Sequence, residues 1–465
     1  MIKKFRCQHG THQVPRLRWS EAAAAVAIET GERLDAAGLQ FGPEDIRFTI
    51  HSPSLASAMI VSEGIMTSRA RARAGSDQAP VLAPLVVLVS SALLVLAQLY
   101  LAIPVAPVIG RMFASGRGAA AAASGTTYAL AYGVGFLIFG PLSDRYGRKP
   151  ILVPGMALLA LVTAGLATAS TLQVVGVLRA VQGLVAASFS AAALAYVGEA
   201  LPPRWRSTGI GAMSTAFLSA GILGQVYAQA VVDALGWRWV FGLAAPALMM
   251  AAIAIAVILL EPPHTGEPVS LAQKYRALRS LAFRRELLLP NLASFPVLLS
   301  FVAMYAALGP LLETEFGLLH RGVLLVRLAG LPAMLLAPLA GWAVGHYGPT
   351  RVAATGFLVA GAGLCAEALS AVALWALVIS SVIFVLGVAT IVPAVIGLVG
   401  ARGGSLRAGA LGLNGLAVFA GASCGPLVAQ LPIGFTSLLL ILALLLIVAS
   451  GLVVISSRRT AEITV

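Results

Sequence analysis

A short stretch from Gly140 to Pro150, GPLSDRYGRKP, gathers four charged side chains in an otherwise apolar region. An aspartate in such a place can pair with a neighbouring arginine or with the positive N-terminal end of another helix. Such a contact can hold one side of a protein shut and break when it opens. The alternative is that the basic residues only anchor the stretch at a membrane surface. The candidate latch residues are Gly140, Asp144, Arg145, Gly147, Arg148 and Lys149.

Arg179 is a second candidate, because it lies inside a long apolar segment that contains the sequence LRAVQG. A charge in such a place is expensive and marks a functional site by default. The i, i+3 spacing puts Gln182 on the same helix face. Arg179 could bind an anionic group or set the proton affinity of a nearby carboxylate. The alternative is a side chain that extends to the membrane interface.

Polar and aromatic side chains within other apolar segments are candidates for lining a cavity. A cavity with few charges and several aromatic rings suits neutral or amphipathic ligands. Each of these residues can equally serve in packing. They are Gln98, Tyr100, Tyr128, Tyr132, Gln225, Tyr227, Asn291, Tyr305 and Asn414.

Proton coupling requires a group that titrates, and no Asp or Glu is expected in the middle of an apolar segment. Glu199 is expected near the inner end of its segment, and Asp233 and Glu367 near the outer ends of theirs. The sequence therefore offers no clear proton carrier, and Asp233 and Asp144 remain the candidates.

Composition indicates which elements must position these residues. Of the 465 residues, 59% are hydrophobic and 11% are charged, whereas soluble domains carry about 25% charged residues. Many windows of about 20 residues are almost free of charge, which is the length of a membrane-spanning helix. The expected fold class is an all-α polytopic membrane protein. A transmembrane barrel would instead show alternating segments of about ten residues.

Several function classes are not expected from this composition. Cys7, Cys365 and Cys424 are too scattered for a disulfide framework or a metal cluster, so no metal is expected. The six histidines are scattered and no nucleotide-binding P-loop is present, so neither a membrane enzyme nor an ATP-driven pump is expected. No cofactor is expected either. Loop arginines account for the net charge of +13 better than nucleic-acid binding does.

Twelve apolar segments are expected from Leu82 onward, and the longest polar gap between them follows the sixth. With the N-terminus inside, eighteen Lys and Arg residues fall in cytoplasmic segments and four or five in outer ones. The positive-inside rule therefore predicts that both termini are cytoplasmic. The expected organisation is a polar N-terminal extension at 1–81, six-helix bundles at 82–260 and 287–456, a cytoplasmic linker at 261–286 and a tail at 457–465.

The N-terminal extension differs from the rest of the chain. Residues 1–65 hold seven acidic and seven basic residues and resemble no known domain. The sequence from Trp19 to Gln40 predicts an amphipathic helix with Ser20 as its cap. Three interpretations stay open: a poorly ordered tail, a segment that is not translated because Met66 is the true start, or a regulatory segment.

An internal repeat links the two halves. GWAVGHYGPTR, which begins at Gly341, matches the stretch that begins at Gly140 at an offset of 201 residues. The same offset aligns Arg206 with Arg407, which common small residues cannot explain. A parallel repeat of six plus six helices is typical of transporters whose halves move about a site in the middle of the membrane.

The stretch from Gly140 to Pro150 resembles the signature loop of the major facilitator superfamily. LRAVQG is similar to the membrane-arginine motif of the family, and GEALPPRWRSTGIG and GWRWVF resemble the segments that lead into its fifth and sixth spans. The likeness covers residues 82–456 and is strongest to the efflux branch of multidrug and arabinose exporters. It implies a latch role for Asp144, and the repeat suggests the N-terminus of the eleventh span, near Arg407, as its partner.

One motif departs from the family pattern. In the fifth span, where the antiporter motif belongs, Ala220 and Gln225 stand in place of a glycine and a proline. This weakens the assignment to proton-coupled antiport. The eleventh span instead carries the whole helix-packing pattern, which consists of Gly412, Gly421, Gly425 and Pro426.

The resemblance implies a monomeric secondary transporter in the inner (plasma) membrane that moves small organic molecules, by efflux, with proton coupling left open. Its partners are a small-molecule substrate and the lipid bilayer, without nucleic acid. Import of a sugar or another metabolite is the alternative within transporters. A membrane sensor built on a transporter scaffold is the alternative from another class. The substrate, the direction and the coupling ion are not readable from these residues.

Overall fold

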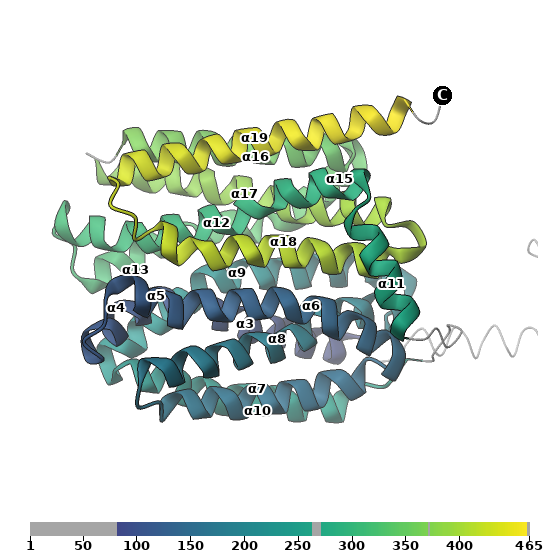
Figure 1. The fold of residues 1–465 in the computed structure, drawn as a ribbon, viewed down its shortest axis with the longest axis horizontal. Coiled ribbons are helices and arrows are strands. Elements are labelled where there is room, and N and C mark those ends of the chain that lie inside the picture. Colours follow the sequence, from purple (N-terminus) through teal and green to yellow (C-terminus); the bar gives the residue numbers. More distant parts are fainter. Residues whose placement is uncertain (1–80, 263–270, 371–372, 463–465) are drawn as a thin grey trace, which may run out of the picture. The chain divides into compact units, whose positions relative to one another are not determined.

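The computed structural model describes residues 81–262, 271–370 and 373–462. Every regular element within these ranges is a helix, and twelve spans are long and apolar enough to cross a membrane (Figure 1). This confirms the expected all-α polytopic fold with twelve transmembrane helices. The predicted amphipathic helix from Trp19 to Gln40 and the alternative start at Met66 lie outside the described residues.

The N-terminal half provides the first six spans. They are formed by α3 (Leu82–Tyr100) with α4 (Ala102–Met112); by α5 (Arg117–Ala121), η2 (Ala122–Thr126) and α6 (Thr127–Tyr146); and by α7 (Lys149–Ala167), α8 (Leu172–Ala200), α9 (Pro203–Leu235) and α10 (Trp237–Ile258). The second span thus contains a π-helical turn, η2, which the sequence did not predict.

The C-terminal half provides the other six spans. They are formed by α12 (Arg285–Thr314); by α13 (His320–Leu328), α14 (Leu331–Leu335) and α15 (Ala337–Tyr347); and by α16 (Pro349–Leu369), α17 (Leu374–Arg402), α18 (Arg407–Val428) and α19 (Phe435–Glu462), with the 3₁₀ turn η3 (Gly404–Leu406) before α18. Pro332 and Pro338 stand in the first turns of α14 and α15. Proline lacks the N–H that continues a helix, so the eighth span is divided at these points.

The internal repeat is visible in the backbone. Gly147 between α6 and α7 has φ 102°, and Gly348 between α15 and α16 has φ 81°. These two glycines stand 201 residues apart. Both close a very short turn between two spans in a conformation that other residues rarely adopt. The same turn therefore joins the second and third spans of each half.

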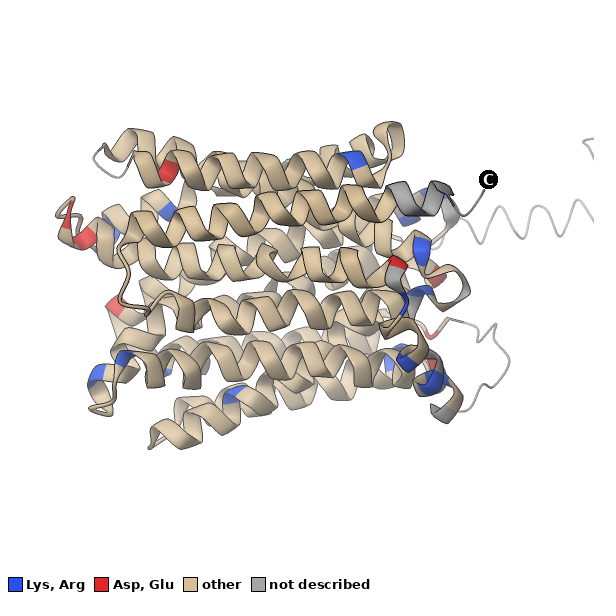
Figure 2. Cartoon of the chain, turned by 45° about the horizontal axis from the view of Figure 1, so that its top comes forward, with Lys and Arg blue, Asp and Glu red and all other residues tan. Residues whose placement is uncertain are grey.

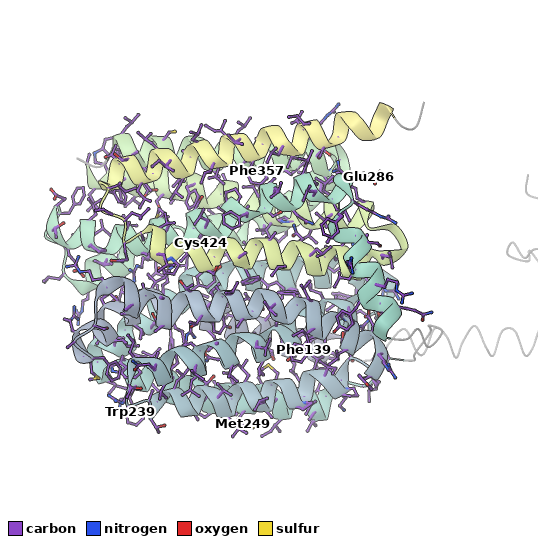
Figure 3. All side chains as sticks on the ribbon, in the orientation of Figure 1. Phe139, Trp239, Met249, Glu286, Phe357 and Cys424 are labelled. Atoms are coloured by element: carbon purple, nitrogen blue, oxygen red, sulfur yellow. The ribbon has the colours of Figure 1, made fainter. Side chains whose placement is uncertain are left out.

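Each half is a packed bundle. In the N-terminal half, α6 packs on α8, α7 on α10 and α3 on α9; in the C-terminal half, α16 packs on α17 and α19, and α12 on α18. Side chains fill the space between the helices, as Phe357 does, while others such as Trp239 point outward from the bundle (Figure 3). An apolar outer surface suits a bilayer, where lipid replaces water around the protein.

The two halves meet along two sets of helices. α6 lies against α18, and α9 lies against α13, α14 and α15. The interface between α6 and α18 uses small residues: a Cβ atom on Gly133 would lie 3.2 Å from that of Phe419. Small residues allow close helix approach without a hydrophobic driving force.

The linker contains a helix that the sequence did not predict. Helix α11 (Leu271–Ala282) lies at one end of the bundle and contacts α6 of the first half and both α12 and α18 of the second. We call this end of the molecule the α11 end (Figure 1). Charged residues gather at the two ends of the spans and leave the length between them nearly free of charge (Figure 2).

Candidate functional site

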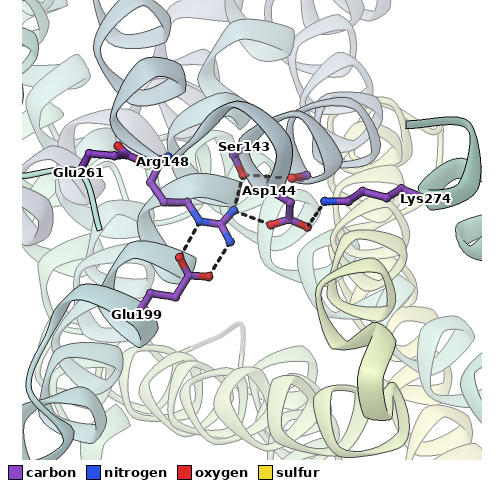
Figure 4. Close-up of polar contacts among 7 residues, drawn as sticks. Ser143, Asp144, Arg148, Glu199, Glu261 and Lys274 are labelled. Atoms are coloured by element: carbon purple, nitrogen blue, oxygen red, sulfur yellow. Dashed lines mark hydrogen bonds and ion pairs between the residues drawn. The ribbon is translucent and has the colours of Figure 1, made fainter. Parts of the chain in front are cut away.

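The densest group of charged contacts lies at the α11 end, around Arg148 (Figure 4). Its guanidinium donates to Asp144 Oδ1 at 2.5 Å and to the two carboxylate oxygens of Glu199 at 3.0 and 2.6 Å. It also donates to the Ser143 hydroxyl at 2.8 Å. Arg148 therefore joins the end of α6 to the end of α8. We call Asp144, Arg148 and Glu199 the ion cluster.

Two effects of opposite sign act on the pKa of Arg148. Burial alone would lower this pKa, because the side chain is only 10% exposed. Hydrogen bonds and charge attraction from Glu199 and Asp144 outweigh burial, so the pKa lies above its ordinary value. Arg148 therefore remains a cation at any physiological pH.

Glu261, which follows α10, binds the N-terminus of α7. The backbone N–H groups of Arg148 and Lys149 donate to its two carboxylate oxygens at 2.7 and 2.6 Å. These N–H groups have no partner within the helix, and the helix dipole favours a negative charge there. Glu261 thereby ties the end of the sixth span to the start of the third.

Asp144 contacts a different partner from the one that the internal repeat suggested. Asp144 Oδ2 lies 3.7 Å from Lys274 Nζ on α11, and its other oxygen accepts from Arg148. Among the described residues, the charged partners of Asp144 are Arg148 and Lys274 rather than the N-terminus of the eleventh span, and α11 contacts both α6 and α18. Leu278 and Leu281 of α11 face Gly409 of α18. The linker helix therefore contacts the latch stretch with its basic residue and the second half with its leucines.

The remaining latch residues lie around this cluster but differ in their contacts. Gly147 provides the turn described above, and Lys149 contributes its backbone N–H to Glu261. Gly140 has open space at its Cβ position. Arg145 is exposed and lies over the ring of Tyr146, 5.4 Å from its centroid.

Arg179 is fully buried between irregular parts of the first two spans. Its guanidinium donates to Ser124 O at 2.6 Å, within the π-helical turn, and to Gln98 O at 2.9 Å, close to the break between α3 and α4. It also donates to Gln182 Oε1 at 2.6 Å and lies 4.3 Å from the centroid of the Tyr128 ring. Arg179 thus binds carbonyl groups at two places where the helices depart from regular geometry.

Gln182 extends this group of contacts. Its amide donates to Gln98 Oε1 at 3.1 Å and to Thr163 Oγ1 at 2.8 Å. One guanidinium nitrogen of Arg179, Nη2, has no hydrogen-bond partner among the described residues. The charge of Arg179 is therefore held mainly by dipoles and an aromatic ring, without an acidic residue in contact.

Aromatic rings lie where the halves meet. Tyr132 and Phe136 of α6 contact Phe419 of α18, with ring centroids 4.2 and 5.7 Å from it, and Tyr132 also hydrogen-bonds Ser190. Tyr100 of α3 also contacts Phe301 of α12, with centroids 5.6 Å apart. These rings bury apolar area between the halves and present several π-faces in one region.

Four other candidate lining residues have hydrogen-bond partners within their own half, and their role in lining a cavity stays a prediction. Asn414 donates to Asn291 Oδ1 at 3.2 Å and to a serine at 2.7 Å, within the C-terminal half alone. Tyr227 donates to Val240 O at 2.8 Å and packs with α10. Gln225 is buried and donates to Gly221 O at 2.6 Å. The spacing of these residues along their own helices did not predict which neighbouring residue each side chain contacts.

The glycine motif of α18 is divided between two neighbours. A Cβ atom on Gly421 would lie 1.9 Å from Phe295 O of α12, and one on Gly425 would lie 2.7 Å from Val302. Gly412 faces Phe136 O of α6 at 3.6 Å. Pro426 packs against Gly125 of the π-helical turn. The motif lets α18 approach one helix in its own half and one in the other.

Comparison with known proteins identifies the family. The sequence profile of the Major Facilitator Superfamily matches residues 88–330, which is more than half of the chain. The chain belongs to this superfamily. The signature stretch and the membrane-arginine motif both lie within the matched range.

Relatives of the superfamily support the same assignment at low identity. The chain is 27% identical over 275 residues to the inner membrane transport protein YnfM of Escherichia coli, covering 58% of this chain and 65% of YnfM. It is 28% identical over 120 residues to multidrug resistance protein 3 of Bacillus subtilis, covering 26% and 23% of the two chains. Matches to the first curated relatives span only 24% to 30% of their length.

Solved superfamily structures share the fold. A bacterial homologue of the human lysosomal transporter Spinster, in an inward-facing and unoccupied conformation, superposes with a TM-score of 0.62 at 16% identity. The match covers 82% of this chain and 97% of that structure. The twelve-helix fold of the superfamily is therefore present.

Several residues of this superfamily member escaped prediction from sequence. Lys274 and Glu261 lie in the polar linker, where no pattern distinguished them from solvated charges. Glu367 was expected near the outer end of its segment, and Arg327 was the doubtful fifth basic residue of the outer segments. Both are buried, with 0% and 4% exposure. Neither residue fits the regular spacing of apolar residues along its segment. This was the only signal in the sequence, and it does not show what surrounds either side chain.

Proposed function

We propose that this chain is a secondary transporter that exports small organic molecules across the inner (plasma) membrane by alternating access. The observation that carries the proposal is the arrangement at the α11 end. There the ion cluster contacts a linker helix that touches both halves. Closing this end requires Asp144, Lys274 and the leucines of α11 to be in place together, and opening it requires them to separate.

The interfaces between the halves support a rocking motion. Small residues and aromatic rings meet between α6 and α18, and Thr126 of the adjoining turn η2 donates to Ser423 O of α18 at 2.6 Å. Such surfaces separate at less cost than a network of buried ion pairs. Reversible separation at alternate ends is the movement expected of two pseudo-repeats around a central site.

The proposed orientation places the α11 end in the cytoplasm, with both termini on that side. Arg148 and Lys274 lie at this end (Figure 4), as do Lys149 and the other basic residues of α11. By the positive-inside rule, this end then faces the cytoplasm when the monomer lies in a plasma membrane. The buried aromatic interface favours neutral or amphipathic substrates, and export is favoured by likeness to named multidrug transporters.

Transport into everted membrane vesicles tests this proposal. Radiolabelled chloramphenicol serves as the neutral amphipathic probe, ethidium as a cationic one and arabinose as a sugar. We expect chloramphenicol to accumulate when the vesicle interior is acidic, and Asp144→Asn at equal protein level to accumulate less. Accumulation of no probe above vesicles without the protein would refute the proposal. Uptake of arabinose in right-side-out vesicles would favour import instead.

A further inference from the structure

Glu367 lies near the end of α16, two residues before Leu369, yet its side chain is 0% exposed. Neither carboxylate oxygen has a hydrogen-bond partner among the described residues. Gly363, one turn earlier, packs directly against the backbone of Phe384 on the antiparallel helix α17. Glu367 is therefore placed one turn further along the same interface, opposite Ser380, inside the protein rather than at its end.

Few charged groups surround this carboxyl. The helices packed along α16 are α17 and α19, with α15 before it; their ionisable residues, such as Arg402, lie near the α11 end. Tyr305 of α12 lies within electrostatic range of Glu367, and Arg327 of α13 lies within range of the same tyrosine. An ionised carboxylate here lacks both hydrogen bonds and a counter-ion in contact, so burial favours the neutral acid.

The other acidic residues in the described part of the chain are held differently. Asp144 and Glu199 are ion-paired with Arg148. Asp233 accepts a hydrogen bond from Gln229 at 2.9 Å in an exposed position. Among described acids, Glu367 combines complete burial with the absence of a hydrogen bond to either oxygen.

Tyr305 connects this region to the interface between the halves. A Cβ atom on Gly330 would lie 2.9 Å from the Tyr305 hydroxyl and 2.9 Å from Ile222 Cδ1 of α9. The Tyr305 ring also packs on Phe301, with centroids 4.9 Å apart. Tyr305 therefore lies at the junction of α12, α9 and the segment that follows α13.

We propose that Glu367 is the proton-carrying residue that couples transport to the proton gradient, an inference that rests on the transport function proposed above. One carboxylate oxygen takes up a proton from the aqueous phase at the end of the bundle opposite α11. The neutral acid is then stable while the helices pack around it. After the halves move, the same O–H bond breaks and the proton leaves toward the cytoplasm. No other bond forms or breaks.

The test compares coupled and uncoupled transport of radiolabelled chloramphenicol in proteoliposomes. A gradient of about one pH unit supports about tenfold accumulation in a one-for-one exchange. We expect this accumulation in the wild type and in Glu367→Asp, which keeps an acid. Glu367→Gln should show none, while its exchange of labelled for unlabelled probe stays within about twofold of wild type, as an intact cycle without a gradient requires. Glu315→Gln, an exposed acid at the same end, is the matched control.

An infrared measurement separates this inference from the transport proposal. Difference spectra between about pH 6 and about pH 9 should contain the carbonyl band of a protonated carboxylic acid in the wild type and in Glu315→Gln, and lack it in Glu367→Gln. Accumulation by Glu367→Gln equal to wild type, or a band that persists in that variant, overturns the inference while transport stands. Exchange of the probe by the wild type without accumulation in the pH gradient overturns the coupling as well. Failure of the wild type to exchange the probe, with the band present, refutes the choice of substrate class and leaves the protonated Glu367 supported.

Discussion

Replacement of Asp144 by asparagine tests whether the α11 end is held shut by the ion cluster. The amide keeps the size of the side chain but removes its charge. Arg148 then loses one charge-assisted bond, and Lys274 loses its counter-ion at 3.7 Å. Glu199 continues to accept two bonds from Arg148, so the arginine is not left unpaired.

The expected magnitude follows from exposure and from the remaining partners. Removing one partner of a fully buried ion pair costs about 3 to 5 kcal/mol. Asp144 is 25% exposed and Arg148 is 10% exposed, and Glu199 remains, so we expect about 1 to 2 kcal/mol for this contact. The contact with Lys274 adds less than about 1 kcal/mol. Among the described residues, only the Lys274 contact joins this cluster to α11, so its loss raises the population with α11 detached by less than about fivefold.

Hydrogen–deuterium exchange of the α11 backbone measures this population directly, because a helix of this length is marginal without its tertiary contacts. We expect faster exchange over Leu271–Ala282 in Asp144→Asn than in the wild type. Asp233→Asn is the matched control, since it makes the same substitution at the opposite end and should leave α11 exchange unchanged.

A double-mutant cycle identifies the contact responsible. The free-energy change in the double variant should differ from the sum of the changes in Asp144→Asn and Lys274→Gln. We expect this difference to be less than about 1 kcal/mol, as for a partly exposed pair. Unchanged exchange of α11 in Asp144→Asn would refute the latch. Full additivity of the two variants would show that Lys274 does not act through Asp144.

Three further predictions concern stability. Glu261→Gln weakens the charge-assisted contacts at the start of α7 and should lower stability by about 0.5 to 1 kcal/mol, seen as a lower melting temperature in detergent. Arg179→Lys keeps the charge but cannot reach all of the present acceptors, so we expect a loss of about 2 to 4 kcal/mol by the same measurement. Gly421→Ala places a methyl group where Phe295 O lies 1.9 Å away, and should destabilise by about 1 to 3 kcal/mol through forced separation of α12 and α18.

A specific result would contradict each of these three predictions. Glu261→Ala should be at least as destabilising as the glutamine variant, and a stable alanine variant would exclude the helix-cap role. An Arg179→Lys protein as stable as wild type would mean that the carbonyl contacts contribute little. Gly451→Ala, with nothing within 4 Å of its Cβ position, is the control for Gly421→Ala, and equal losses would exclude steric separation as the cause.

The predictable part of this protein depends on local composition. Long apolar segments must form helices in a bilayer because each backbone polar group has to be satisfied within its own segment. The twelve spans and the six-plus-six division follow from that rule. The turn at Gly147 and its copy at Gly348 follow from short spacing between spans, which leaves room only for a residue with positive φ.

The unpredicted part depends on contacts between distant segments. Nothing in the linker composition distinguishes Lys274 from other exposed basic residues, and its meeting with Asp144 requires α11 to lie across the bundle. Arg179 was recognised as an unusual buried charge, but its acceptors exist only because a π-helical turn and a helix break expose carbonyl groups beside it. The hydrogen-bond partners of Asn414 and Tyr227 were not predictable for the same reason.

Sequence by itself determined the membrane class, the number of spans, the repeat and the stretch that carries the charged latch, because each rests on hydrophobicity or on residue type along the chain. Tertiary structure alone decided the partner of Asp144, the helix cap at Glu261 and the burial of Glu367. Position near the end of a span suggested that Glu367 meets water. Close packing of α16 against α17 excludes water instead, and so turns an ordinary acid into a candidate proton carrier.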